Sequence, residues 1–189
     1  ANTMRSLNGA WSYSWQGELT DSFTLEYNTI YEAFAKKYNA SNVKFIPGVS
    51  YKKSGSFYDM IENNIDQVLI EAKKSDYVIL CLGENTYTEK PGDLNDLNLH
   101  KLQLKLASKL ADCGKPIILV LNIGRPRLIS EIEPLMSAIV NIYLPGNLGA
   151  DALVDIVYGD INPSGKLPYT YPAFPNSLST YYYKPSEVQ

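Results

Sequence analysis

The chain contains two uninterrupted apolar runs, YVILCL at 77–82 and PIILVLN at 116–122. Both are rich in β-branched residues and lack the polar alternation of a half-exposed strand, which is typical of strands buried on both faces. Two shorter runs of the same kind, VKFI and AIVNIY, occupy 43–46 and 138–143. The four runs predict parallel strands.

Helical periodicity fills the segments between these runs. An amphipathic stretch at 152–157 stops at Gly159, in keeping with a glycine helix stop. Elsewhere, apolar residues recur at spacings of three and four. The periodic sets are Tyr27, Ile30, Tyr31, Phe34 and Tyr38; Ile61, Ile65, Val68, Leu69 and Ala72; and Leu99, Leu102, Leu106 and Leu110. Strands that alternate with helices predict a doubly wound α/β sandwich, a mainly parallel sheet with helices on both faces.

The predicted order of elements lacks a strand at its start. A helix at about 24–38 should follow a strand, yet 1–20 is polar and rich in Gly, Ser and Asn. We therefore expect the first strand to be missing, and the slot it leaves to be an edge that another polypeptide or the rest of the protein covers. Positions 1–189 are otherwise predicted to form one domain, with an irregular, proline-rich tail at 163–189.

Composition and charge exclude several classes of function. Of the 189 residues, 45% are hydrophobic, and 17 Lys and Arg stand against 20 Asp and Glu, so nothing favours binding to nucleic acid or to an anionic membrane. No apolar run approaches the roughly 20 residues of a membrane-spanning helix. Cys81 and Cys113 are expected to be buried free thiols, and with His100 they share no zinc-site spacing. We expect no metal and no cofactor, and for His100, at a helix start, either exposure to solvent or a local hydrogen bond.

One loop is long and acidic, GENTYTEKPGDLNDLN at 83–98. It follows a predicted strand, at the edge where open α/β sheets bind ligands, and it exceeds the usual two to six residues of such connections. Its acids are Glu84, Glu89, Asp93 and Asp96, and Tyr87 lies among them. Such a loop can simply be solvated, and Asp96 is a candidate cap for the following helix. Alternatively, Glu84 or Glu89 serves as a protonated acid in sugar chemistry.

A second segment, WSYSWQG at 11–17, brings two indoles and a phenol into one glycine-flanked loop. A single tryptophan is most often buried by core packing. Two in a loop, with no strand alternation to bury both, favour a platform on which a flat, partly apolar ring can stack. Trp11 and Trp15 are therefore candidate binding residues.

In this order, the two loops resemble glycoside hydrolase family 3, the β-glucosidases and β-glucan exohydrolases. Three later motifs are similar to the second-domain signatures of that family and follow in the same register: NIGRP at 122–126, YLPG at 143–146 and GDINPSGKLP at 159–168. The resemblance covers 11 to about 172.

The resemblance implies that this α/β domain carries the catalytic acid/base, while a TIM-barrel domain that is absent from this chain supplies the nucleophilic aspartate. The second glutamate of a Gly-Glu-x-x-Tyr-Thr-Glu run places the acid/base on Glu89, with Glu84 in reserve because acid/base loops differ between branches. Trp15 would line the aglycone subsite, with Trp11 as its neighbour or as packing, and Tyr87 would contact substrate. Asp93 and Arg125 would be structural.

The implied reaction is retaining hydrolysis of terminal non-reducing β-D-glucosyl residues, with xylose as the nearest alternative sugar. The partners would be a carbohydrate substrate and the barrel domain, the isolated chain would be inactive, and the compartment would be periplasmic or extracellular. A non-catalytic carbohydrate-binding or scaffolding domain is the alternative from another class. A flavodoxin-like receiver or nucleotide domain is disfavoured because no phosphate-binding glycine loop follows any strand.

Overall fold

The computed structural model describes residues 2–53 and 56–175. At its centre lies a parallel sheet in the order β3 (Val78–Gly83), β4 (Ile117–Asn122) and β5 (Ala138–Asn141). Val78 pairs with Ile117, and Ile118 pairs with Ala138. In the central strand, Leu119 and Val120 are completely buried, and each contributes roughly 2 kcal/mol of stability through apolar burial. The two long apolar runs are thus parallel strands, as predicted.

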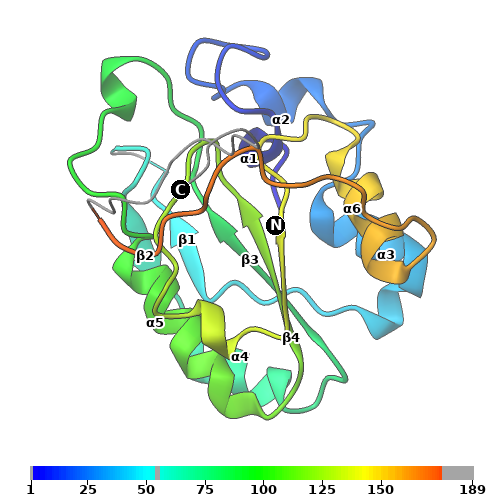
Figure 1. Ribbon diagram of the computed structural model, residues 1–189. Helices are drawn as coiled ribbons and strands as arrows, with labels where there is room; N and C mark the ends of the chain where they lie inside the picture. Colours follow the sequence, from blue (N-terminus) through cyan, green and yellow to red (C-terminus); the bar gives the residue numbers. More distant parts are fainter. Residues whose placement is uncertain (1, 54–55, 176–189) are drawn as a thin grey trace.

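Helices cover both faces of this sheet (Figure 1). α4 (Ile65–Ala72) and α5 (Lys101–Leu110) pack on one face, where Leu119 contributes to the core. α3 (Ile30–Tyr38) and α6 (Gly149–Tyr158) pack on the other face, where Val120 contributes. Neighbouring residues of β4 therefore enter opposite cores, as the alternation of a strand requires. The predicted doubly wound α/β architecture is confirmed.

Local hydrogen bonds decide where the helices begin. α3 starts at Ile30, not near 24 as predicted, because Thr29 and Glu32 form a capping box: Glu32 N donates to Thr29 Oγ1 at 3.3 Å and Thr29 N donates to the Glu32 carboxylate at 2.8 Å. α5 is capped by His100, whose Nδ1 accepts from Leu102 N at 3.1 Å. The prediction of Asp96 as that cap is wrong, because its carboxylate accepts from Asn98 instead.

The segment 43–46 does not form the predicted strand. It is extended but enters no ladder, because a groove of about 730 Å³, lined by 44–53 on one side and 77–85 on the other, separates this part of the chain from β3. The nearest strands are β1 (Val49–Tyr51) and β2 (Met60–Glu62), which pair antiparallel with each other. Ile61, predicted on the helical face of α4, lies in β2. This two-stranded ribbon was not predicted.

Short elements complete the described chain. The polar segment before α3 contains two single-turn helices, and 163–175 forms neither helix nor strand, while the rest of the predicted tail, 176–189, lies outside the described residues. The short elements are α1 (Arg5–Asn8), α2 (Thr20–Phe23), η1 (Ala40–Asn42), η2 (Lys90–Gly92), η3 (Ala111–Cys113) and η4 (Glu133–Leu135). Both cysteines are free; Cys113 is buried as predicted, whereas Cys81 is only partly buried. Among the described helices, none has the length and apolar character needed to cross a bilayer.

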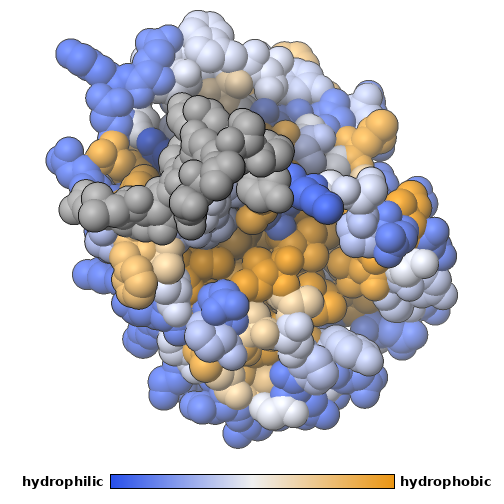
Figure 2. All heavy atoms as spheres, viewed as in Figure 1, coloured by the Kyte–Doolittle hydropathy of each residue, from blue (hydrophilic) through white to orange (hydrophobic). Residues whose placement is uncertain are grey.

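The surface of the molecule is not uniformly polar. In the orientation of Figure 1, apolar side chains gather at the centre of the view, between α5 and α6, which pack on opposite faces of the sheet (Figure 2). The β3 edge and this apolar surface are both places where a domain of this kind would gain from cover.

Candidate active site

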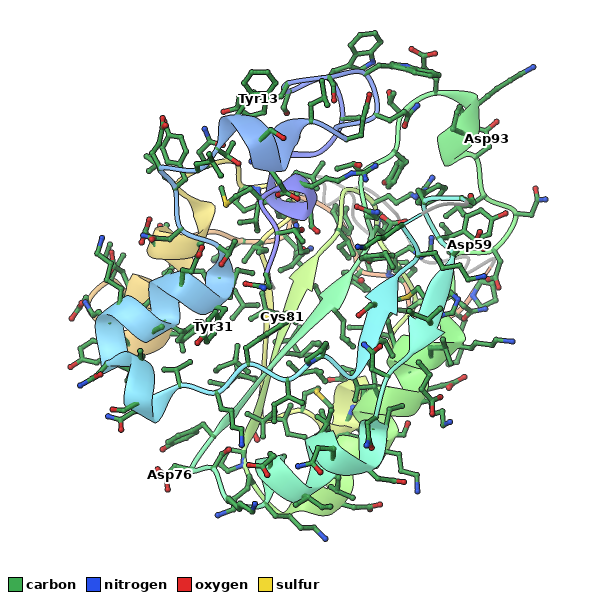
Figure 3. All side chains as sticks on the ribbon, turned by 180° about the vertical axis from the view of Figure 1, so that it is seen from behind. Tyr13, Tyr31, Asp59, Asp76, Cys81 and Asp93 are labelled. Atoms are coloured by element: carbon green, nitrogen blue, oxygen red, sulfur yellow. The ribbon has the colours of Figure 1, made fainter. Side chains whose placement is uncertain are left out.

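The two loops singled out in the sequence lie at the same end of the sheet. Figure 3 shows Asp76, which precedes β3, at one end of the molecule, and Asp93, in the acidic loop, at the other. Parallel strands place their carboxyl ends together, so the loops that follow β3 and β4 meet at this edge. The loop 9–17, from the amino-terminal part of the chain, lies beside them. We call this end of the molecule the carboxyl rim.

Glu89 and Trp15 meet at the exposed carboxyl rim. Trp15 Nε1 donates to Glu89 Oε1 at 3.3 Å, and the indole remains 47% exposed. The carboxyl group of Glu89 is therefore held beside an open aromatic ring. A substrate that approached the rim would meet both side chains together.

Gln16 joins the two loops through its amide. Its Nε2 donates to Thr88 O at 3.2 Å, and Thr88 N donates to Gln16 Oε1 at 3.1 Å, so the side chain mimics a strand pairing. Sequence reasoning missed Gln16. Its only signal was its position directly after Trp15 and before Gly17.

Thr86 provides a second connection between the loops. Its hydroxyl donates to Gln16 O at 2.5 Å and accepts from Arg5 Nε at 2.8 Å. Gly17 packs closely against this threonine at φ 73°, and a Cβ there would lie only 2.8 Å from Gly9 O. Only glycine combines this conformation with this approach. The tryptophan loop is thereby seated on the acidic loop.

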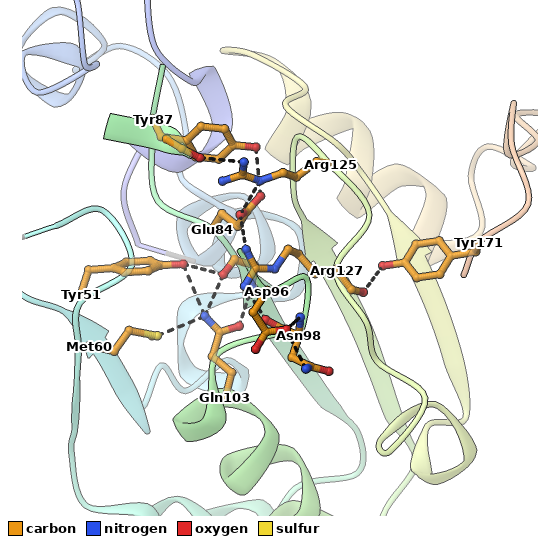
Figure 4. A network of polar contacts seen from close by, with 12 residues as sticks. Tyr51, Met60, Glu84, Tyr87, Asp96, Asn98, Gln103, Arg125, Arg127 and Tyr171 are labelled. Atoms are coloured by element: carbon orange, nitrogen blue, oxygen red, sulfur yellow. Dashed lines mark hydrogen bonds and ion pairs between the residues drawn. The ribbon is translucent and has the colours of Figure 1, made fainter. Parts of the chain in front are cut away.

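Glu84, the reserve candidate, faces away from the rim into a buried polar network (Figure 4). Its Oε1 accepts from Arg125 Nε at 3.2 Å and from Arg127 Nη1 at 2.9 Å. Its Oε2 accepts from the Tyr87 hydroxyl at 3.1 Å. A carboxylate that is 7% exposed and paired with guanidinium groups is engaged structurally. Of the two glutamates, Glu89 is the one that is exposed at the rim.

Tyr87 packs within the base of the loop. Its ring lies 4.0 Å from Arg125 Cζ and 4.8 Å, centroid to centroid, from the ring of Phe57. Burial, with the Glu84 carboxylate nearby, raises the pKa of Tyr87 to about 12, so its hydroxyl remains a donor at neutral pH. Tyr87 is thus half-buried within the loop, packed between Arg125 and Phe57.

Arg125 and Arg127 come from the loop that follows β4. Arg125 was predicted to be structural, and Arg127 was overlooked, although GRPR at 124–127 places both directly after a strand. Arg127 Nη2 donates to Asn98 O, and its own carbonyl accepts from the Tyr171 hydroxyl at 2.6 Å. The two guanidinium groups tie the acidic loop to β4 near both of its ends.

Trp11 is the most open aromatic residue of the tryptophan loop, at 66% exposure. Its backbone has φ 59°, and its N–H closes the loop by donating to Ser14 O at 3.1 Å. The side chain is not buried in a core and is available at the surface. In the described part of the chain, no three or more His, Cys, Asp or Glu side chains gather in a way that could hold a metal ion.

Fold and site together define a class of protein. The α/β sandwich presents an exposed glutamic acid beside a tryptophan at the carboxyl edge of its sheet, the edge where open α/β sheets bind ligands. The profile of the "Glycosyl hydrolase family 3 C-terminal domain" matches residues 2–189. The chain belongs to glycoside hydrolase family 3, as a β-glucosidase-like domain.

Similar proteins support this assignment. A lysosomal β-glucosidase of Dictyostelium discoideum is 33% identical over 99% of this chain and 23% of its own length. A β-xylosidase of Formosa agariphila is 32% identical over 66% of this chain and 17% of its own length. A periplasmic β-glucosidase of Salmonella typhimurium is 32% identical over 62% of this chain and 16% of its own length. The crystal structure of a β-glucosidase from Listeria innocua in complex with glucose matches with a TM-score of 0.56 and 29% identity, over 64% of this chain and 17% of that one. The chain thus spans less than a quarter of each relative's length.

Proposed function

We propose that this domain supplies Glu89 as the general acid/base, and Trp15 as an aglycone-subsite aromatic, of a retaining exo-acting β-glucosidase. One observation carries the proposal: the Glu89 carboxyl group lies on the exposed rim, hydrogen-bonded to Trp15 at 3.3 Å. The nucleophilic aspartate belongs to another part of the whole protein. The chain by itself is then inactive, because it holds one of the two carboxyl groups that the reaction needs.

In the first step, the aspartate attacks the anomeric carbon while Glu89 gives its proton to the departing glycosidic oxygen. The bond between the anomeric carbon and that oxygen breaks, and a glycosyl ester forms on the aspartate. In the second step, the Glu89 carboxylate takes a proton from water, which displaces the aspartate and releases the sugar. The two carboxyl groups must approach to roughly 5 Å, so the glycone-binding part must dock over the rim.

Apolar side chains on the rim support such docking. Trp11, Phe23 and Leu148 are exposed. Tyr13 links them into one area. Its ring stacks on that of Phe23, with 5.8 Å between the ring centroids, and the Tyr13 hydroxyl accepts a hydrogen bond from Asn147 Nδ2, next to Leu148, at 2.8 Å. An exposed apolar area rimmed by polar groups is typical of a contact surface.

The test is Glu89→Gln in the whole protein, assayed on aryl β-glucosides with good and poor leaving groups. Substrates with poor leaving groups need the proton, so we expect their kcat/KM to fall on the order of 100-fold or more. The kcat/KM for 2,4-dinitrophenyl glucoside should fall much less. Azide, an anion that needs no general base, should restore turnover of the activated substrate. Asp93→Asn, in the same exposed loop, is the matched control and should behave as wild type.

An equal loss on both substrates would count against an acid/base role for Glu89. Unchanged hydrolysis would favour the non-catalytic carbohydrate-binding alternative. The likeness to a β-xylosidase makes xylose the competing sugar. Comparing kcat/KM for 4-nitrophenyl β-glucoside and β-xyloside distinguishes the two, and a preference for the xyloside would reassign the substrate.

We also propose an exported or otherwise enclosed compartment, which the periplasmic and lysosomal relatives support. Cell fractionation of the source organism tests this directly. Recovery of the protein in the cytosolic fraction would contradict it.

A further inference from the structure

Glu89 occupies a backbone conformation that its surroundings must hold in place. Its φ of 53° and ψ of −153° lie in a region that residues with a side chain seldom adopt. The residue precedes the 3₁₀ turn η2, and the turn is closed by Gly92 N, which donates to Glu89 O at 2.8 Å. The position of the Glu89 carboxyl group therefore depends on where Gly92 is fixed.

Arg125 fixes Gly92. Its Nη1 donates to Gly92 O at 2.7 Å, and its Nε donates to Glu84 at 3.2 Å. The guanidinium plane also lies over the Tyr87 ring, 4.0 Å from its centroid. Opposite charge, a ring face and a carbonyl thus hold the guanidinium group in one place before any substrate binds.

The packing around Gly92 requires a residue without a side chain. The residue is buried, and a Cβ built on it would lie 2.5 Å from Tyr87 Cδ2. Even alanine would therefore push the ring away from beneath Arg125. The contact between the turn and the arginine leaves no room for a side chain at this position.

Arg127 provides an internal comparison. It also donates to Glu84, at 2.9 Å, and its side chain is more buried than that of Arg125, at 8% exposure against 25%. Its other donated bond, however, goes to Asn98 O, beyond the far end of the turn. Both arginines stabilise the loop, but only Arg125 reaches the turn that Glu89 precedes.

We propose that Arg125, itself held by Glu84, is a positioning residue that sets where the Glu89 carboxyl group points. This inference rests on the proposed acid/base role of Glu89. A displacement of the acid by about 1 Å slows proton transfer strongly while leaving sugar binding intact. Loss of Arg125 should therefore lower kcat on substrates that need protonation, with little change in KM.

The experiment compares Arg125→Gln, Arg127→Gln and Gly92→Ala in the whole protein, on 2,4-dinitrophenyl glucoside and on a phenyl glucoside with a poor leaving group. For Arg125→Gln and Gly92→Ala we expect kcat/KM on the poor leaving group to fall roughly 10- to 100-fold, with kcat/KM on the activated substrate nearly unchanged. The ratio kcat/KM is compared because it excludes the second step, in which Glu89 acts as base for both substrates. Arg127→Gln should lower Tm at least as much, but any loss of activity should be equal on both substrates. Gly92→Ala removes no charge, so it keeps the test open if Arg125→Gln does not fold.

Equal losses on the two substrates for Arg125→Gln and Gly92→Ala would show a purely structural role and overturn the proposal. Glu89→Gln is run in parallel. If Glu89→Gln itself shows no dependence on the leaving group, the proposed function fails. If Glu89→Gln shows that dependence and the Arg125 and Gly92 variants do not, only the positioning role fails.

Discussion

At the scale of single residues, the two glutamates of one loop have different fates. Glu84 directly follows β3, and its N–H extends the ladder by donating to Asn122 O at 3.1 Å. Its side chain is consequently held at the end of the sheet, where the arginines after β4 surround it. Glu89 lies beyond the part of the loop that the sheet constrains, on an exposed turn. The number of residues between each glutamate and the end of β3 therefore explains why the Glu84 carboxylate anchors the loop while that of Glu89 is accessible.

The backbone of Glu89 leads to a prediction about stability. Glu89→Gly should be more stable than Glu89→Ala by about 1 kcal/mol, because glycine relieves the strain of the positive φ while alanine keeps it. Both variants lack the same carboxylate, so the difference isolates the backbone. Urea unfolding of the pair measures it. If the alanine variant is as stable as the glycine variant, the conformation at this position is not strained.

At the scale of elements, β3 is hydrogen-bonded to β4 along one of its two sides. Val78 N donates to Pro116 O and Glu84 N to Asn122 O, so alternate residues of the strand point toward β4. The residues between them point toward the groove. Of these, Gly83 is bonded at both its N–H and its C=O by the Gln103 side chain, at 2.9 and 2.8 Å. Ile79 and Cys81 have no such side-chain cover among the described residues.

We therefore predict an alternating pattern of amide hydrogen exchange along β3. Leu80 and Leu82, whose N–H groups face β4, should exchange slowly, and Ile79 and Cys81 should exchange at least tenfold faster. Gly83 is the internal control, because it faces the groove but is bonded, and it should be slow. Exchange followed by NMR gives each rate. Uniformly slow amides in this chain would mean that the β3 edge is already paired, whereas slow exchange only in a longer protein would show a covering strand.

At the scale of the whole molecule, partly buried tyrosines join distant elements around the Glu84 network. The Tyr51 hydroxyl, from β1, donates to Gly83 O at 2.7 Å, and the Tyr171 hydroxyl, from the irregular tail, donates to Arg127 O at 2.6 Å. Burial raises the pKa of Tyr171 to about 12, and it raises the pKa of Tyr51 well above its usual value. The ribbon, the sheet and the tail are thus connected by hydroxyls that must remain protonated.

This arrangement predicts a loss of stability at high pH. A tyrosine in the unfolded chain ionises near pH 10, whereas Tyr171 in the folded chain ionises at about 12. Between these values the unfolded state binds fewer protons, so the free energy of unfolding falls as pH rises through this window. Urea unfolding at pH 9 and pH 11.5 measures the fall. Tyr171→Phe should be less stable at pH 9 but should lose less on going to pH 11.5, and an unchanged slope would contradict the assignment.

Periodicity alone was enough to predict much of the fold. The buried runs became β3 and β4, and α5 and α6 lie where apolar spacing places them. The run at 43–46 failed because a strand exists only where another strand accepts its hydrogen bonds, and a groove lies there instead. The cap of α5 failed because His100 and Asp96 are both plausible by position, and only the path of the loop decides which one reaches Leu102.

By itself, the sequence determined the architecture, the edge of the sheet at which the candidate site lies and the two loops that form it, since these follow from local periodicity and chain order. Tertiary structure alone decided which glutamate is accessible, that Gln16 joins the loops and that Arg125 reaches the turn of Glu89. The physical reason is that hydrogen bonds between residues distant in the chain depend on side-chain directions set by packing, and apolar spacing carries no information about these directions.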